Sequence, residues 1–319
     1  MNVPLEEELN ALLESSPPAE SLSSAAGECE IPVVDMRLLV GHPRERNKCL
    51  KAMADAASSF GIFQIVNHGV PSEVRTLLVD DAKEAFAFPF SRKRLANQTY
   101  RWGNPHAVTL SQFQWSEAFH VSLRDINAYE SFRWSAERFA KSCYAICQTL
   151  AEHLAQYSGL GSDPRFFKEN CGAASCYIRM NRYPKCPFSG HVLGMLPHTD
   201  SDFLTVLHQE RVCGLEILRD GRWLAARSDP KALVVIVGDL FQAYSNNMYV
   251  SLKHRVVTKK EEDRFSAAFF YCPEQETRIT SCLTPAYREF SFGEYQRQIR
   301  KDVKATGNKV GLSRFLLNI

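Results

Sequence analysis

From residue 174 onward the chain consists of short apolar segments separated by turn residues, and this pattern constrains the fold most strongly. The turns include Asp220-Gly221 and Asn246-Asn247. Segments of this length with turn signals between them predict β-strands in an antiparallel sandwich or barrel. We expect strands at residues 175–183, 203–209, 214–219, 222–226, 232–238, 253–258 and 264–271.

The preceding half of the chain is predicted to be mostly helical. Apolar periodicity and helix-start signals predict helices over residues 4–14, 43–59, 72–87 and 129–157. A short edge strand is expected at 31–35, a buried strand within 60–69, and irregular, aromatic-rich chain at 91–116. A final helix is expected to begin near Ser291, because Ser291 and Glu294 have the spacing of a capping box.

The chain is therefore predicted to be one α+β unit with helices first and a β core second. Residues 15–27 are rich in serine, proline and alanine, as expected of a linker. We expect residues 1–30 to be a mobile N-terminal tail, 31–170 a mostly helical region, and 171–319 the β core with its C-terminal helix.

Charge and composition indicate a globular protein with a small-molecule partner. Hydrophobic residues make up 45% of the 319 residues, and the net charge is +2 from 38 basic and 36 acidic residues. Such a balance gives no reason to expect nucleic acid or an anionic membrane as partner. We expect a monomer.

The ten cysteines are predicted to be free thiols. Cys143 and Cys147 lie four residues apart, and the chain has no CxxC pair of the kind that zinc clusters use. The first residues are acidic rather than basic and apolar, and no apolar run approaches the ~18 residues of a membrane span. These features favour an intracellular protein, in the cytoplasm or alternatively the nucleus.

His198, Asp200 and His254 are candidate metal ligands. His198 and Asp200 lie two residues apart, so a strand would direct both side chains to one face. A second histidine, His254, begins another expected strand, and two histidines with one carboxylate form the facial triad of non-haem iron oxygenases. Asp202 creates an HxDxD ambiguity that spacing leaves open, and His254 alone fits a core histidine equally well.

A second group of residues predicts an anion site beside the metal. Strand alternation places Arg264 and Ser266 on one face of 264–271, and Asn181 and Tyr183 on one face of 175–183. A buried guanidinium needs a partner, and its planar fork fits a carboxylate. The alternative is an exposed edge strand with Arg264 in solvent.

Seven segments in this order resemble the plant 2-oxoglutarate-dependent dioxygenases. They are IPVVD at 31–35, GIFQIVNHGVP at 61–71, NRYPKCP at 181–187, HTD at 198–200, GDLFQAYSNN at 238–247, KHRVV at 253–257 and RFSAAFF at 264–270. The resemblance runs from about residue 30 to the C-terminus. It implies a distorted double-stranded β-helix, or jelly-roll, flanked by helices.

The resemblance also implies the cofactors and the site. Fe(II) would be held by His198, Asp200 and His254, and 2-oxoglutarate by Arg264 and Ser266 near Asn181 and Tyr183. The co-substrate would be 2-oxoglutarate and the oxidant O2, with ascorbate supporting turnover. The reaction implied is oxidative decarboxylation of 2-oxoglutarate to succinate and CO2, coupled to hydroxylation of a small organic molecule.

The segment YRWGNPHAVTLSQFQWSEAFHVSL at 100–123 is similar to the gibberellin 2-oxidases that act on twenty-carbon precursors. This implies a diterpenoid carboxylate hormone or precursor as substrate, with hydroxylation at C-2. Departures from the family pattern at Met180, Lys185, Glu216 and Tyr244 leave the oxidised carbon open. Candidate substrate residues are Trp102, Trp115, Phe119 and His120, with Tyr100 and Arg101 nearby.

Other interpretations remain at this point. The substrate could be oxidised at another carbon, or be another metabolite such as a flavonoid. A catalytically silent binding protein would not need the anion clamp of Arg264 and Ser266, and a zinc hydrolase would leave it unexplained. Asp239 is either an acceptor behind a ligand histidine or a turn residue.

Overall fold

The turn residues of the second half reverse the chain as the sequence predicts. Asp220 and Gly221 both have positive φ, at 48° and 74°, which is the conformation of a tight two-residue hairpin. This turn joins β9 (Leu215–Arg219) to β10 (Arg222–Arg227), with Arg219 paired to Arg222 across it. Turns of this kind build the sheets that carry the site.

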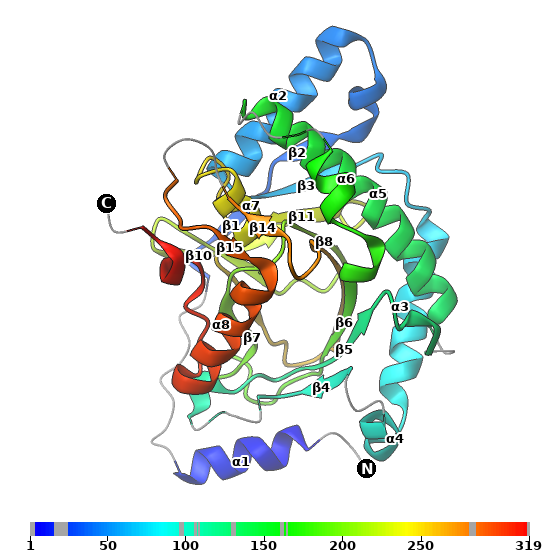
Figure 1. Cartoon of the computed structure of the whole chain (residues 1–319). Helices are drawn as coiled ribbons and strands as arrows, with labels where there is room; N and C mark the ends of the chain where they lie inside the picture. Colours follow the sequence, from blue (N-terminus) through cyan, green and yellow to red (C-terminus); the bar gives the residue numbers. More distant parts are fainter. Residues whose placement is uncertain are drawn as a thin grey trace.

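The computed structural model describes residues 4–15, 25–95, 99–104, 107, 109–128, 132–159, 163, 165–280 and 285–317. Within these ranges most strands form two sheets (Figure 1). The larger sheet has eight strands in the order β2 (Val33–Asp35), β3 (Ile62–Val66), β11 (Leu233–Val237), β8 (Leu204–Gln209), β13 (Arg264–Tyr271), β6 (Tyr177–Tyr183), β5 (Glu117–Ser122) and β4 (Tyr100–Trp102). The smaller sheet has five, in the order β1 (Glu28–Glu30), β10, β9, β12 (His254–Val257) and β7 (Leu193–His198). A separate hairpin pairs β14 (Arg278–Ile279) with β15 (Phe290–Ser291).

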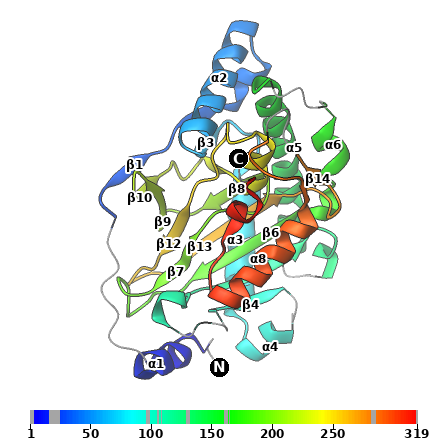
Figure 2. The ribbon, with the colours of Figure 1, turned by 60° about the vertical axis from the view of Figure 1, so that its left-hand side comes forward.

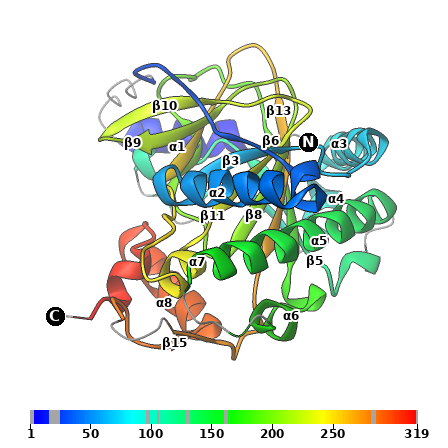
Figure 3. The ribbon, with the colours of Figure 1, turned by 90° about the horizontal axis from the view of Figure 1, so that it is seen from above.

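Two layers of apolar side chains hold these elements together. Between the sheets, buried residues of both pack into one cluster that includes Leu207, Ile217, Ile236 and Ala268. The other face of the large sheet is covered by α2 (Pro43–Ser59), α3 (Ser72–Ala87) and α5 (Arg133–Tyr157) (Figure 3). Burial on both faces explains why β11 is apolar throughout, with no alternation, and why every residue of β8 is buried, including Thr205, His208 and Gln209.

The remaining helices are shorter or lie at the edges. They are α1 (Leu5–Ser15), α4 (Phe90–Leu95), α6 (Phe166–Asn170), α7 (Asp239–Tyr244) and α8 (Phe292–Thr306), with 3₁₀ turns at η1 (Met36–Val40), η2 (Leu110–Gln112), η3 (Ile126–Ala128), η4 (Ala173–Ser175) and η5 (Gly311–Phe315). Ser291 caps α8 by accepting a hydrogen bond from the Glu294 N–H at 3.1 Å, as the capping-box spacing predicts. Facing sheets with flanking helices confirm the expected α+β jelly-roll.

The structure contains six strands that the sequence did not predict, and besides β1, β14 and β15 three of them lie in the sheets around the site. β7, β4 and β5 were not among the predicted strands. β7 contains Gly194 and Pro197, which weaken the strand signal, and β4 is three residues long inside the region expected to be irregular. β7 pairs with β12, β4 with β5, and β5 with β6. Hydrogen bonds between these strands stabilise them where the local sequence does not favour a strand.

Much of the expected N-terminal tail is packed against the body. In α1, Leu5 and Leu9 are one helical turn apart and buried against Leu110, Phe113 and Trp115. Figure 2 shows α1 next to the β4 end of the molecule. β1 pairs in parallel with β10 in the small sheet, and residues 16–24 lie outside the described residues.

The division at residue 170 also differs from the sheet topology. The large sheet takes β2, β3, β4 and β5 from the first part of the chain. The nine described cysteines are free thiols, and none of the described helices is long and apolar enough to span a bilayer.

Candidate active site

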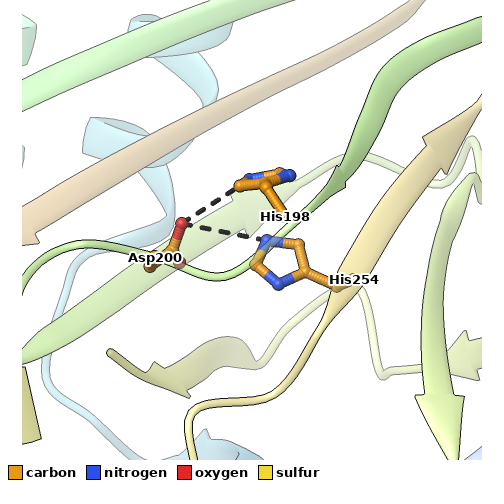
Figure 4. Close-up of side chains that lie close together, drawn as sticks. All are labelled: His198, Asp200 and His254. Atoms are coloured by element: carbon orange, nitrogen blue, oxygen red, sulfur yellow. Dashed lines mark ion pairs between the residues drawn. The ribbon is translucent and has the colours of Figure 1, made fainter. Parts of the chain in front are cut away.

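Strand pairing in the small sheet brings His198 and His254 together. β7 ends at His198, β12 begins at His254, and the two residues are direct partners in the antiparallel register. Their ring centroids are 4.3 Å apart, and Asp200 follows two residues after His198. The Asp200 Oδ1 lies 3.7 Å from Nε2 of His198 and 3.8 Å from Nε2 of His254 (Figure 4). Three ligand atoms therefore surround one point.

Each potential ligand is oriented by a hydrogen bond on its far side. The Nδ1 of His198 lies 2.8 Å from the carbonyl of Leu196, and the Nδ1 of His254 lies 3.1 Å from the carbonyl of Leu252. A carbonyl only accepts, so Nδ1 carries the proton in both rings and each Nε2 presents a lone pair. The Thr205 hydroxyl donates to Asp200 Oδ2 at 2.7 Å, which leaves Oδ1 for a metal.

Electrostatics favour the metal-binding form of this group. Burial, followed by the charge of His254, lowers the pKa of His198 to about 3, so its imidazole is neutral at pH 7. Burial alone would raise the pKa of Asp200, but the two histidines and the Thr205 hydroxyl lower it below its ordinary value. Neutral imidazole and ionised carboxylate are the forms that bind a divalent cation.

The structure distinguishes Asp200 from Asp202. Within the described residues, His198, Asp200 and His254 are the one group of three or more potential ligand side chains whose atoms all lie within 4.8 Å of one another. Asp202 is fully buried, has its Oδ2 3.0 Å from Thr205 Oγ1, and has its pKa raised by burial and by Asp200. Asp202 therefore lies behind the metal group.

A buried cation faces this group from the large sheet. Arg264 is 2% exposed, and its guanidinium lies over the Tyr183 ring at 4.9 Å. Its Nη2 donates to Gln209 Oε1 at 2.7 Å and its Nη1 to Ser266 Oγ at 3.5 Å. Among the described residues its Nε has no hydrogen-bond partner and no carboxylate pairs with it. A buried, unpaired guanidinium fits an anionic ligand.

Strand register explains why the predicted anion-site residues gather here. Arg264 is opposite Tyr183, and Ser266 is opposite Asn181, across the β13–β6 pair. Asn181 Nδ2 lies 3.5 Å from Ser266 Oγ. Gln209 lies opposite Ser266 on β8 and was not predicted, because a glutamine at the end of an apolar strand gives no local signal.

One cavity of about 610 Å³ contains both groups. Its lining includes the three potential metal ligands, Arg264, Ser266, Asn181 and Tyr183. It then extends to a mouth formed by β4, β5 and the C-terminal end of α8, through Arg101, Gln114, His120, Val303 and Asn308. The alternative of Arg264 in solvent does not agree with its burial.

The predicted substrate residues are placed in different surroundings. His120 lines the cavity, where its ring stacks on Tyr177 at 4.2 Å, and Tyr177 stacks on Phe270 at 4.4 Å. Burial and the nearby Arg179 and Arg101 lower the pKa of His120 to about 4. Tyr177, Arg179 and Phe270 also line the cavity and were not predicted as site residues.

The other candidates lie behind the cavity wall. Trp102 donates to Glu8 at 3.0 Å, Trp115 donates to the Pro184 carbonyl at 3.1 Å, and Phe119 packs on Phe86. Tyr100 donates to the buried Glu117 at 2.5 Å. Arg101, for which a solvated position was expected, does contribute to the cavity lining.

Asp239 contacts neither ligand histidine through any hydrogen bond of the described residues. Its carboxylate accepts from the Thr199 hydroxyl at 3.0 Å and from Tyr295, and it forms an ion pair with Lys309 at 2.6 Å. Asp239 therefore supports the loop that carries Asp200.

Comparison with known proteins agrees with this geometry. Residues 174–273 match the 2OG-Fe(II) oxygenase superfamily, and residues 31–137 match the N-terminal domain described as non-haem dioxygenase in morphine synthesis. Gibberellin 2-beta-dioxygenase 8 of Arabidopsis thaliana is 46% identical over 94% of this chain and 90% of its own length. Gibberellin 2-beta-dioxygenase 6 of Oryza sativa subsp. japonica is 42% identical over 94% and 89%.

Solved structures show the same fold. The crystal structure of JOX2 in complex with 2OG, Fe and JA has a TM-score of 0.78 at 25% identity, over 99% of this chain and 98% of that one. The dioxygenase for auxin oxidation in rice has a TM-score of 0.73 at 26% identity, over 90% and 100%. Together with the two-histidine, one-carboxylate group, these matches identify the cofactors as Fe(II) and 2-oxoglutarate. The chain belongs to the 2OG-Fe(II) oxygenase superfamily.

Proposed function

We propose that this enzyme hydroxylates a gibberellin, at C-2 of a twenty-carbon precursor. The observation that carries the proposal is the identity of 39–46% to four gibberellin 2-beta-dioxygenases, each over at least 88% of its own length. The preference for twenty-carbon precursors rests on the segment 100–123, which includes β4 and β5 at the cavity mouth.

In this proposal the inner end of the cavity holds the reagents. Fe(II) would be bound by His198, Asp200 and His254, and would supply the redox chemistry that couples 2-oxoglutarate decarboxylation by O2 to C–H hydroxylation. Arg264 would pair with one carboxylate of 2-oxoglutarate. Its guanidinium is already fixed by Gln209 and Ser266, so little side-chain entropy is lost on binding.

Asn181 and Tyr183 complete this end of the cavity. They occupy β6 opposite Ser266 and Arg264, and both line the cavity. An amide and a phenol can donate hydrogen bonds to carboxylate or keto oxygens. Their role is to orient 2-oxoglutarate between the guanidinium and the metal.

The outer end of the cavity suits an apolar polycycle that bears a carboxylate. Its walls include Phe270 of β13 and Ile299 and Val303 of α8. Arg179 also lines it, donating through Nε to Asn181 Oδ1 at 2.8 Å, and no ion pair of Arg179 occurs among the described residues. A cation in an apolar cavity favours an anionic substrate over a neutral one. Arg179 would therefore pair with the substrate carboxylate.

The test combines three substrates with one substitution. Purified enzyme receives Fe(II), ascorbate, O2 and 2-oxoglutarate with a twenty-carbon gibberellin, a nineteen-carbon gibberellin, or the methyl ester of the first. Succinate is quantified, product masses are determined by mass spectrometry, and NMR locates the new hydroxyl. We expect one added oxygen per succinate on the twenty-carbon acid, with the hydroxyl at C-2.

The methyl ester and Arg179→Met isolate the charge interaction. In the wild type, the ester should have a KM about tenfold higher than the acid, because it loses one charge-assisted hydrogen bond. This difference in KM should shrink in Arg179→Met. Hydroxylation at another carbon would replace the C-2 assignment. Succinate without any gibberellin product would overturn the substrate class, and a flavonoid panel would follow. No succinate at all would indicate a silent binding protein.

A further inference from the structure

A buried cluster of hydrogen bonds lies behind the loop that carries Asp200, and Lys309 is at its centre. The Lys309 side chain is 11% exposed. Its Nζ lies 2.7 Å from the Thr199 carbonyl, 2.8 Å from Ser201 Oγ and 2.6 Å from Asp239 Oδ2. An ammonium group has three donors. All three are used, and two of them go to the residues on either side of Asp200.

Asp239 holds the same loop from the start of α7. Its backbone N–H donates to the Asp200 carbonyl at 2.9 Å, and its carboxylate accepts from the Thr199 hydroxyl. Lys309 and Asp239 thus fix the main chain at Thr199 and Asp200 and the side chain of Ser201. The Asp200 carboxylate, with Oδ2 bonded to Thr205, has little freedom left.

Lys309 belongs to the C-terminal segment that lines the cavity mouth. α8 ends at Gly307, which has a φ of 73° and donates its N–H to the Val303 carbonyl at 2.8 Å. Val303, Gly307, Asn308 and Lys309 all line the cavity. The lysine therefore connects the mouth to the metal-ligand loop.

We propose that Lys309 is a positioning residue that sets the affinity of the site for Fe(II) by fixing the loop 199–201. Loss of its ammonium group would leave the Thr199 carbonyl and the Ser201 hydroxyl without this donor and Asp239 without its cation. Buried groups left in that state move toward new partners. Displacement of the Asp200 carboxylate from the two Nε2 atoms would follow. Groups behind metal ligands contribute on the order of 10- to 100-fold to affinity.

The test measures Fe(II) affinity of the full-length protein under anaerobic conditions, with 2-oxoglutarate present, for Lys309→Met. We expect the Kd for Fe(II) to rise about tenfold. The matched control is Arg314→Met, because Arg314 ties the same C-terminal segment to Asp302 of α8 at 3.0 Å without touching the metal loop. The control should leave the Kd within twofold of the wild type.

Two further measurements separate positioning from general stability. Ser201→Ala removes one Lys309 contact and keeps the ion pair with Asp239, so it should raise the Kd by a smaller factor even if Lys309→Met fails to fold. The Tm of the metal-free proteins reports stability alone. A wild-type Kd in Ser201→Ala and in folded Lys309→Met, with a lowered Tm in the latter, would overturn the proposal.

The inference rests on the metal ligands proposed above, and Asp200→Ala tests them separately. If Asp200→Ala binds Fe(II) normally, the ligand assignment fails. If Asp200→Ala loses Fe(II) while Lys309→Met and Ser201→Ala bind it as tightly as the wild type, only the role of Lys309 fails.

Discussion

The two ends of the cavity are built in different ways. At the inner end, the metal and anion groups lie on or directly after paired strands, and their side chains are held by groups of the same or the adjacent strand, such as Leu196 for His198 and Gln209 for Arg264. At the mouth, β4 has three residues and is supported by α1 through a hydrogen bond between residues 94 apart, Glu8 and Trp102. The chemistry depends on a rigid scaffold, and the mouth depends on docked segments.

This contrast leads to different expectations for substitutions. A change at the inner end should abolish a defined step, because each side chain has one place and fixed partners. A change in the support of the mouth should alter substrate affinity by a small factor and leave the inner end intact. The substitutions below test the contrast.

The largest effect is expected for Asp200→Ala. It removes the one carboxylate of the metal group, and even residues behind metal ligands contribute 10- to 100-fold. We expect Fe(II)- and 2-oxoglutarate-dependent succinate formation to fall by more than about 100-fold. The measurement is succinate release, with Fe(II) binding determined in parallel.

Asp202→Asn is the matched control for Asp200→Ala. Asp202 is buried with a raised pKa and lies 3.0 Å from Thr205 Oγ1, so a neutral amide of the same shape retains this contact. Activity within about threefold of the wild type is expected, since near-isosteric changes of this kind cost little. Loss of Fe(II) binding in Asp202→Asn, but not in Asp200→Ala, would exchange the roles of the two carboxylates.

An intermediate effect is expected for Arg264→Lys. Lysine keeps the charge but loses the planar fork that donates to Gln209 and Ser266 and lies over Tyr183. The KM for 2-oxoglutarate should rise about tenfold, as expected for loss of a charge-assisted contact, while the KM for the organic substrate changes less. Initial-rate measurements with each substrate varied in turn give both constants.

The control for this change is Arg182→Lys on the adjacent strand. Arg182 pairs with Phe265 in register and forms ion pairs with Glu117 and Asp263, outside the cavity lining. Its replacement should leave the KM for 2-oxoglutarate unchanged. Equal increases in both variants would mean that the sheet as a whole, and not the guanidinium of Arg264, determines 2-oxoglutarate affinity.

The same contrast explains what the sequence could predict. Arg264 and Ser266 are found by period-2 spacing, because alternation along a strand decides which face a side chain occupies. The same spacing selected His198 and Asp200, but β7 ends at His198 and Asp200 follows in a loop, so one strand does not carry both ligands as predicted. Strand pairing then places His254 opposite His198. That register is set by strands far apart in the sequence. Whether Asp200 or Asp202 lies beside both histidines could not be predicted without it.

The mouth could not be predicted in this way. Trp115 and Phe119 are aromatic and close in sequence to His120, yet they pack behind the wall while His120 faces the cavity. Glu117 has a charged side chain in a strand but is fully buried, where it accepts from Lys93 at 2.6 Å and Arg182 at 2.8 Å. Contacts between distant segments decide these orientations, and local pattern does not report them.

The smallest effect is expected for Glu8→Ala in α1, and it tests the contrast most sharply. Glu8 accepts the indole N–H of Trp102 at 3.0 Å. Gly103, with a φ of 51°, lies so close that a Cβ there would be 3.0 Å from Glu8 Oε2 and 3.5 Å from Leu5. Trp102 is flanked by Arg101 and Gly103, which both line the cavity. Loss of this contact should loosen β4 at the mouth.

A hydrogen bond to a charged acceptor at a half-buried position contributes on the order of 1 kcal/mol, and only part of it should appear in substrate binding. We expect the substrate KM to rise two- to threefold, roughly, and the KM for 2-oxoglutarate to stay constant. Glu7→Ala is the matched control, because Glu7 is exposed on the same helix and its replacement makes the same change of charge.

Trp102→Phe should raise the substrate KM similarly, and Glu8→Ala should add nothing in the Trp102→Phe background. If Glu8→Ala raised both KM values equally, α1 would support the whole cavity, and the inner end and the mouth would not be separable.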